Sequence, residues 1–342
     1  MKFYHTVIVL LIALQACQNS GTYQTETATN AAQPSQQDQE LLKAAQAVFQ
    51  PLPALAENSE NALTPEKISL GKFLYYDNRL SKTGNNSCNS CHNLSTYGVD
   101  NKATSTGDAG KNGERNSPTV LNAALHSTQF WDGRAKDVEE QAGMPIMNPV
   151  EMAIPDKNFL IKKLNGIAEY KEKFSKAFPE DKNPVNFDNL QKSIAAFERT
   201  LITPSKFDKY LAGDLTAMNE EEKAGMKTFM DAGCTACHVG PVLGGTMLQK
   251  FGLVADYHTL TGSNPKDEGR KNVTKQDTDK DFFKVPGLRN IAKTAPYFHD
   301  GSVNDLDKAV SIMAKVQFNK DLTEAELKSL HAFFDALTGE VP

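Results

Sequence analysis

Cys88-Asn-Ser-Cys91-His92 and Cys234-Thr-Ala-Cys237-His238 are two copies of one short pattern, and this pattern decides the fold class. Two thiols separated by two residues on a tight turn can bond to the two vinyl groups of one porphyrin. The histidine that follows then lies beneath the iron as its axial ligand. The sequence therefore predicts two covalently bound haem c groups, one at each motif.

Three other interpretations of these four cysteines compete with haem. Two disulfides would suit an exported protein, and one zinc ion could be held by four thiolates. Cys-x-x-Cys pairs also occur in thioredoxin-like redox proteins. None of the three needs a histidine directly after each pair, so covalent haem explains more of the pattern.

Length and composition restrict the class of protein. A chain of 342 residues is long enough for two domains of ordinary size. With 39% hydrophobic residues, 23% charged residues and a net charge of −5, it has the composition of a soluble globular protein. It has no basic stretch of the kind that binds nucleic acid.

The first 17 residues have the layout of a secretory signal, with Lys2, an apolar run over 7–14 and then Leu14-Gln15-Ala16-Cys17. The apolar run is too short to span a bilayer. A cysteine after Leu-x-Ala resembles the lipobox of bacterial lipoproteins, although Gln15 is unusual there and an ordinary cleaved signal is the alternative. Residues 18–39 are too polar to pack and predict a disordered tether. We expect a periplasmic protein anchored to a membrane by lipid on Cys17.

A similar helix precedes each haem motif. Glu66-Lys-Ile-Ser-Leu-Gly71-Lys-Phe-Leu-Tyr75 stands before the first motif and Glu222-Lys-Ala-Gly225-Met-Lys-Thr-Phe229 before the second. In both, a glycine lies four residues before an aromatic residue, so the two share a helix face and the glycine can admit another helix closely. These helices resemble the N-terminal helix of cytochrome c folds, which indicates an internal duplication.

Apolar residues at intervals of three and four predict further helices over 40–50, 157–164, 168–178, 187–201, 206–212, 303–315 and 323–338. The last has a capping box of Thr323 and Glu326, and Gly339 is expected to supply a left-handed residue past its end. No convincing alternating strand run appears. The predicted fold is mainly α, with two cytochrome c-like haem domains over 40–203 and 204–342 and long loops around the cofactors.

Residues beyond the haem motifs resemble a known family. In the first half these are Arg115-Asn-Ser-Pro-Thr-Val-Leu-Asn122, Gln129-Phe-Trp-Asp-Gly-Arg134 and Val150-Glu-Met152. In the second half they are Phe283-Lys-Val-Pro286, Leu288-Arg-Asn290 and Pro296-Tyr-Phe-His-Asp-Gly301. Together they resemble the bacterial dihaem cytochrome c peroxidases, in order over about 40–342. The resemblance implies reduction of hydrogen peroxide to water with electrons from a small redox protein, a cytochrome c or a cupredoxin.

The resemblance also implies a division of labour between the two irons. Electrons enter at the C-terminal haem, whose iron is closed by His238 and by Met313, because a thioether ligand favours reduced iron. Met313 lies fourteen residues beyond His299, as in the family. Met247 is the main competitor for this position, and a core-filling role is the alternative for Met313.

The N-terminal haem, with His92 as its ligand, is where peroxide reacts. Glu151 is implied as the base that moves a proton between the peroxide oxygens, because burial would raise its pKa toward the working pH. An exposed loop carboxylate is the alternative for this residue. Gln141 is expected beside Glu151, and Trp131, the single tryptophan, between the haems, where it could equally serve to pack an interface.

Further features follow from the resemblance alone. One calcium ion is implied, held by the backbone carbonyls of Asn116, Thr294 and Pro296, since oxygen ligands of this kind suit calcium. His299 is expected near the haems. The resemblance also suggests a homodimer.

The chain departs from the family in the loop after the first haem motif. Many members close the peroxidatic iron there with a removable histidine, and Asp108 stands at its position. Because an aspartate is a poor ligand for this iron, we hypothesise a first haem that is five-coordinate or water-bound when oxidised and active without prior reduction. His126, Met144 and Met147 are conceivable substitutes for the missing ligand.

Two other functions stay open. One is a protein-oxidising relative of the methylamine-utilisation dihaem enzymes, which carry tyrosine in place of the axial methionine, so Met313 argues against it. The other is a non-enzymatic dihaem electron-transfer protein, which peroxide turnover would distinguish from an enzyme.

Overall fold

The computed structural model describes residues 1–2 and 35–342. Residues 3–17 of the predicted signal, with Cys17, and most of the predicted tether therefore lie outside the described residues. Residues Gln36–Pro342 form one compact unit. In the part of the chain that is described, no helix is long and apolar enough to cross a membrane.

The compact unit is mainly α, as predicted. Its helices are α1 (Gln36–Val48), α2 (Pro65–Tyr75), α3 (Cys88–Cys91), α4 (Val138–Met147), α5 (Lys157–Asn165), α6 (Ala168–Ala177), α7 (Phe187–Glu198), α8 (Lys206–Leu211), α9 (Glu220–Asp231), α10 (His258–Thr261), α11 (Lys271–Thr274), α12 (Leu306–Phe318) and α13 (Glu324–Ala336). Two short strands, β1 (Leu248–Lys250) and β2 (Phe282–Lys284), pair antiparallel with Gln249 opposite Phe283.

Each helix predicted from periodicity is present, whereas the short helices α10 and α11 and the two short strands were not predicted. Helix α1 begins at Gln36, so residues 36–39 of the predicted tether are helical. Helix α4 was missed, because Gly143 and Pro145 interrupt its apolar pattern. Its start is nevertheless well defined, since the carboxylate of Asp137 accepts a hydrogen bond from the amide of Glu140.

The two glycine-containing helices pack as the sequence predicts. A Cβ atom on Gly71 of α2 would overlap the carbonyl oxygen of Ser193 in α7, and one on Gly225 of α9 would overlap that of Ser329 in α13. The aromatic residues that follow also correspond. Tyr75 meets Phe197 edge-on and Phe229 meets Phe333 at a tilt, with ring centroids 5.3 and 5.5 Å apart. The same close helix pair is therefore built twice.

A second feature, a 3-10 turn that begins at an asparagine, is also repeated, and both copies contact Thr203. Asn122 and Asn290 both have positive φ and each begins a 3-10 turn, over Ala123–Leu125 and Ile291–Lys293. Both side-chain amides donate to the hydroxyl of Thr203, at 2.8 and 2.9 Å. Thr203 is fully buried, so it joins the two copies of this turn in the interior.

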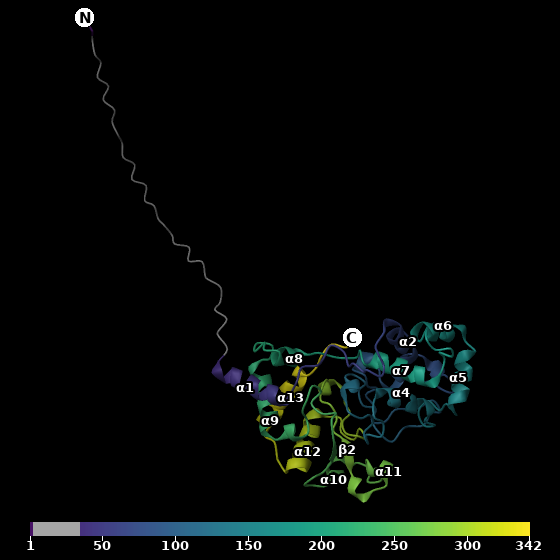
Figure 1. Ribbon diagram of the computed structural model, residues 1–342. Coiled ribbons are helices and arrows are strands. Elements are labelled where there is room, and N and C mark those ends of the chain that lie inside the picture. Colours follow the sequence, from purple (N-terminus) through teal and green to yellow (C-terminus); the bar gives the residue numbers. More distant parts are fainter. Residues whose placement is uncertain (3–34) are drawn as a thin grey trace. The chain divides into compact units, whose positions relative to one another are not determined.

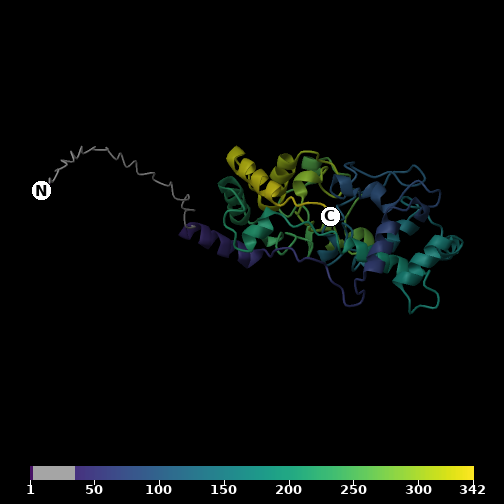
Figure 2. The same ribbon diagram turned by 90° about the horizontal axis from the view of Figure 1, so that it is seen from above.

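Figures 1 and 2 show α2 and α4–α7 on one side of the compact unit and α8, α9, α12 and α13 on the other. The buried apolar residues form separate clusters in these two sides, but residues near both ends of the compact unit pack against the opposite side. Ala45 and Phe49 at the end of α1 belong to the cluster of the second half, and Val341 packs against a cluster of the first half. The segment 40–49 thus does not share its core with the rest of the predicted 40–203 domain.

Gly339 has a different role from the one predicted. The capping box of Thr323 and Glu326 is confirmed, but α13 ends at Leu337 in a right-handed conformation, and Gly339 is not among the residues with positive φ. A Cβ on Gly339 would overlap the carbonyl oxygen of Thr203, and its amide donates to Asn290 at 2.9 Å. Glycine is needed here for close packing of two backbones rather than for a left-handed turn.

Candidate functional site

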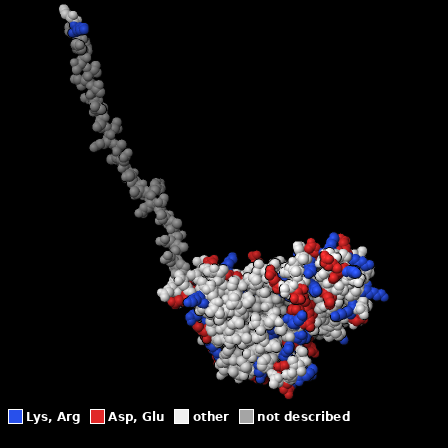
Figure 3. All heavy atoms as spheres, in the orientation of Figure 1, with Lys and Arg blue, Asp and Glu red and all other residues white. Residues whose placement is uncertain are grey.

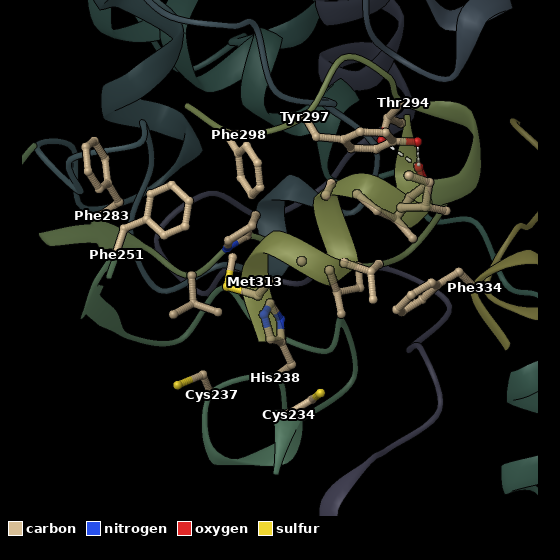
Figure 4. A pocket seen from close by; sticks show the side chains of 18 of the residues that line it. Cys234, Cys237, His238, Phe251, Phe283, Thr294, Tyr297, Phe298, Met313 and Phe334 are labelled. Atoms are coloured by element: carbon tan, nitrogen blue, oxygen red, sulfur yellow. Dashed lines mark hydrogen bonds between the residues drawn. The ribbon is translucent and has the colours of Figure 1, made fainter. Parts of the chain in front are cut away.

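The second cysteine motif opens onto a large cavity lined mainly by apolar side chains (Figure 4). The cavity leaves about 1770 Å³ free of protein atoms, counting its open mouth. Its lining includes Cys234, Cys237, His238 and Met313, four side chains that the sequence assigns to one haem. The donor set and the apolar lining both fit a porphyrin, whose ring is apolar and whose iron takes nitrogen and sulfur ligands.

Met313 lies on α12 and points into this cavity (Figure 4). Met247, the competing candidate, is 37% exposed at the surface and is not part of the cavity lining. Its carbonyl instead accepts the amide of Val285 beside the two-stranded sheet. The structure thus places Met313 and not Met247 in the same cavity as His238.

His238 is oriented by the backbone. Its Nδ1 lies 2.9 Å from the carbonyl oxygen of Leu243, and since a carbonyl only accepts, Nδ1 carries the proton. Nε2 is then the free nitrogen, available to a metal. Burial lowers the pKa of His238, which favours the neutral imidazole that iron binds.

The first motif uses the same arrangement. Nδ1 of His92 lies 3.0 Å from the carbonyl oxygen of Pro118, so Nε2 is again the free nitrogen. The hydroxyl of Tyr75, on α2, donates to the carbonyl oxygen of His92 and so ties the motif to the repeated helix pair. Burial also lowers the pKa of His92.

The geometry argues against two of the competing interpretations, disulfides and a zinc centre. Cys88, Cys91, Cys234 and Cys237 are all free thiols. Among residues 35–342 no three His, Cys, Asp or Glu side chains gather into a site for a metal ion, so the four thiols do not form a zinc centre. Each pair instead stands beside its own backbone-oriented histidine, the arrangement that covalent haem requires.

Glu151 lies in the turn that follows α4. The turn is folded back on the helix, with the amides of Glu151 and Met152 bonded to the carbonyls of Asn148 and Pro145. Burial raises the pKa of Glu151, against a hydrogen bond from Asn148 and the charge of Arg134. The charge of the Glu151 carboxylate also contributes to raising the pKa of the Cys91 thiol, so Glu151 lies near the first haem motif.

Gln141 is half-buried on α4, the helix that leads into the turn carrying Glu151. The partner of the Glu151 carboxylate is not Gln141 but Asn148, whose amide donates to it at 2.7 Å. Asn148 was missed because an Asn that ends a helix usually serves the local backbone. It does so here too, since its side-chain oxygen accepts the amide of Val150.

Asp108 is buried, and its carboxylate is occupied. It accepts the backbone amides of Thr83 at 2.8 Å and Asn85 at 3.0 Å. Burial raises the pKa of Asp108, but these hydrogen bonds outweigh it and hold the pKa below its ordinary value. The backbone amide of Asp108 in turn donates to the carbonyl oxygen of Glu151 at 2.6 Å, so this loop is fastened on two sides.

The other predicted residues meet in the wall of the large cavity, which Asn116, Trp131, Thr294, Pro296 and His299 all line. The indole nitrogen of Trp131 donates to the carbonyl oxygen of Asn116 at 2.9 Å. Nε2 of His299 is buried without a hydrogen-bond partner in the protein. An orphaned nitrogen in a cavity wall is expected where the protein leaves room for a bound group.

One polar pair in this wall was not predicted as a site. Nζ of Lys284 lies 2.9 Å from Nδ1 of His126, and both residues line the cavity. A lysine at a strand end and a lone histidine carry no spacing signal, so only the fold brings them together.

Comparison with known proteins agrees with this geometry. A family model described as di-haem cytochrome c peroxidase matches residues 65–216. The chain is 47% identical to the cytochrome c551 peroxidase of Nitrosomonas europaea, over 82% of this chain and 83% of that protein. It is 45% identical to the cytochrome c551 peroxidase of Pseudomonas aeruginosa, over 87% of this chain and 86% of that protein.

More distant similarity extends to proteins named for methylamine utilisation. The MauG protein of Methylophilus methylotrophus is 34% identical over 82% of this chain and 84% of that protein. Among solved structures, a MauG-like protein associated with microbial copper homeostasis has a TM-score of 0.72 and 28% identity, covering 84% of this chain and 94% of that one.

Proposed function

The chain belongs to the di-haem cytochrome c peroxidase family of oxidoreductases, and we propose that it reduces hydrogen peroxide to two waters with two electrons and two protons. The electrons come from a small redox protein, a cytochrome c or a cupredoxin. The observation that carries the proposal is a contrast between two similar haem motifs. One shares its cavity with a methionine, and the other has a buried carboxylate nearby.

The two haems, when bound, supply the redox chemistry, and the chain supplies ligands, protons and access. At the first motif His92 would hold the iron, and Glu151 would take a proton from one peroxide oxygen and deliver it to the other. A raised pKa suits this task because a base must also be able to return its proton. Gln141 lies on the helix that leads to Glu151 and offers a neutral hydrogen-bonding group.

At the second motif His238 and Met313 would hold the iron, and a haem with these two ligands would supply electron transfer rather than peroxide binding. Trp131 connects the two halves, because its carbonyl oxygen accepts the amide of Lys284 while its indole donates to Asn116, which lies close in sequence to the Pro118 that orients His92. We assign the peroxidatic haem to a domain within residues 40–203 and the electron-transfer haem to residues 204–342. One calcium ion held by Asn116, Thr294 and Pro296 would stiffen their shared wall.

The electron donor is expected at the second half. In Figure 3 the face over α9, α12 and α13 is largely uncharged, whereas charged side chains crowd the region of α2, α5 and α6. Leu253, Val254 and Phe318 are exposed apolar residues of the second half, and Phe318 also lines the cavity. We further propose export to the periplasm and lipid attachment at Cys17.

The first haem is proposed to be accessible in the oxidised protein, without prior reduction. Three candidate ligands for the first iron are engaged elsewhere. The carboxylate of Asp108 accepts two backbone amides. His126 faces the cavity of the second motif, and Met147 packs against an apolar cluster. An electron paramagnetic resonance spectrum of the oxidised protein should therefore contain one high-spin haem. Two low-spin signals would contradict this proposal.

Steady-state turnover of peroxide with reduced cytochrome c tests the function. Glu151→Gln should keep both covalent haems and lower turnover by about 10²–10⁴-fold, the usual contribution of a general acid–base group. Glu180→Gln, at an exposed position, is the matched control and should behave as the unmodified protein. Full turnover in Glu151→Gln would exclude Glu151 from the reaction. A haem-loaded unmodified protein without turnover would favour the electron-transfer alternative.

A further inference from the structure

Lys284, the last residue of β2, and His126 form a buried pair to which the proposed reaction assigns no task. Nζ of Lys284 lies 2.9 Å from Nδ1 of His126, and Lys284 is only 5% exposed. Both residues line the cavity that holds Cys234, Cys237 and His238. An ammonium group is thus placed in the wall of a cavity that is otherwise mainly apolar.

The charge of Lys284 has no paired carboxylate among the residues that the structure describes. A buried charge is costly unless an opposite charge pairs with it. Among residues 35–342, Lys284 takes part in no ion pair, and the carboxylate that influences it, Asp132, is already bonded to Arg115 and Arg134. Burial accordingly lowers the pKa of Lys284 to about 8. An anion supplied from outside the protein chain would restore the balance.

The pair is held in place from both halves of the chain. The backbone amide of Lys284 donates to the carbonyl oxygen of Trp131 at 2.6 Å. A Cβ on Gly245 would overlap the ring of His126, and one on Gly287 would lie 2.9 Å from its Nε2. Because the ammonium group donates, Nδ1 of His126 accepts, and the imidazole is neutral with its proton on Nε2.

The internal repeat gives this pair a counterpart. The alignment that matches Asn122 with Asn290 also matches Asn116 with Lys284 and His126 with Thr294. Asn116 and Thr294 are the residues that the sequence assigns to a calcium ion. Each pair takes one residue from each copy of the repeat, so the two pairs occupy equivalent positions. Where one of these positions is expected to hold a metal cation, the other carries a fixed ammonium group.

We propose that Lys284, supported by His126, binds a propionate carboxylate of the haem held by His238. The inference rests on the proposed function only in assigning a haem to this cavity. A haem c carries two propionates, and a hydrogen bond between an ammonium group and a carboxylate is among the strong ones. Since a nearby positive charge favours the reduced form of the haem, Lys284 should raise the midpoint potential of the second haem.

The test compares the midpoint potentials of both haems in protein that carries two covalent haems. Lys284→Met removes the charge, Lys284→Arg retains it, and Lys293→Met removes an exposed charge close to the same cavity. We expect a lower potential at the second haem in Lys284→Met, substantial recovery in Lys284→Arg and no change in Lys293→Met. The propionate bending band in the resonance Raman spectrum should shift in Lys284→Met alone.

Several results would overturn the inference. They are an unchanged potential and propionate band in Lys284→Met, a shift confined to the first haem, or an equal shift in Lys293→Met. If Lys284→Met does not retain its second haem, Lys284→Gln, which removes the charge but keeps a hydrogen-bond donor, replaces it in the same titration. Turnover is not measured, so failure here is distinguishable from failure of the peroxidase proposal.

Discussion

Asp108→Asn is the substitution that tests how the loop beside Glu151 is fastened. The carboxylate of Asp108 accepts two backbone amides, from Thr83 and Asn85, and is 5% exposed. An asparagine keeps one accepting oxygen but turns an NH₂ group toward the other amide, so one donor is left unpaired. Hydrogen bonds to a charged group contribute about 1.5–3 kcal/mol each, so we expect a loss of about 2–4 kcal/mol in unfolding free energy at pH 7.

The effect should depend on pH with a definite sign. The pKa of Asp108 is lowered in the folded protein, whereas in the unfolded chain it is about 3.9. The stabilisation is therefore complete above about pH 4 and is lost as the pH falls through the folded value. The difference in stability between the unmodified protein and Asp108→Asn should shrink in the same range.

Denaturant unfolding at pH 7 and at pH 3, followed by haem absorbance and far-ultraviolet circular dichroism, measures this difference. Asp188→Asn, at an exposed position on α7, is the control and should change stability by less than about 0.5 kcal/mol. Equal stability of Asp108→Asn and the unmodified protein at pH 7, or a deficit as large at pH 3 as at pH 7, would refute the reasoning.

Three further substitutions test the site and the repeat. Asn148→Ala removes a hydrogen bond that lowers the pKa of Glu151, so the acidic limb of the turnover–pH profile should move to higher pH, with haem spectra unchanged. Met313→Ala should convert the second haem from low spin to high spin and lower its midpoint potential, as spectroelectrochemistry would record. Gly225→Ala should destabilise the protein by about 1–3 kcal/mol in denaturant unfolding through overlap with α13, whereas Gly166→Ala, at an unstrained helix end, should stay within about 0.5 kcal/mol.

The parts of the fold that could be predicted from the sequence are those encoded by local spacing. Two thiols and a histidine within five residues define a haem motif wherever they occur. A glycine four residues before an aromatic residue likewise specifies one helix face, and Gly71 and Gly225 both meet a partner helix as expected. Helix α4 has no such clear pattern, because Gly143 and Pro145 interrupt it, and so it was missed.

The parts that could not be predicted depend on contacts between segments far apart in the chain. Lys284 and His126 meet only because the strand β2 is bonded to the backbone at Trp131. Gly339 was expected to end a helix, but the constraint on it comes from Thr203, more than a hundred residues away. Both contacts join residues too far apart in the sequence to appear in the periodic pattern of a single helix.

The repeat also explains how one architecture can provide two different iron sites. Both halves use a glycine-packed helix pair and a histidine oriented by a carbonyl oxygen, so the histidine side of the two proposed haem sites is built alike. The halves differ in the helix that packs against the second member of each helix pair, which is α4 against α7 in the first half and α12 against α13 in the second. In the second half α12 continues unbroken past Met313. In the first half α4 ends at Met147, and the turn after it presents Glu151. Because α4 packs on α7 and α12 on α13, the two helices have equivalent neighbours. In the proposed function, the residue that each helix presents would then decide whether an iron is closed or accessible to peroxide.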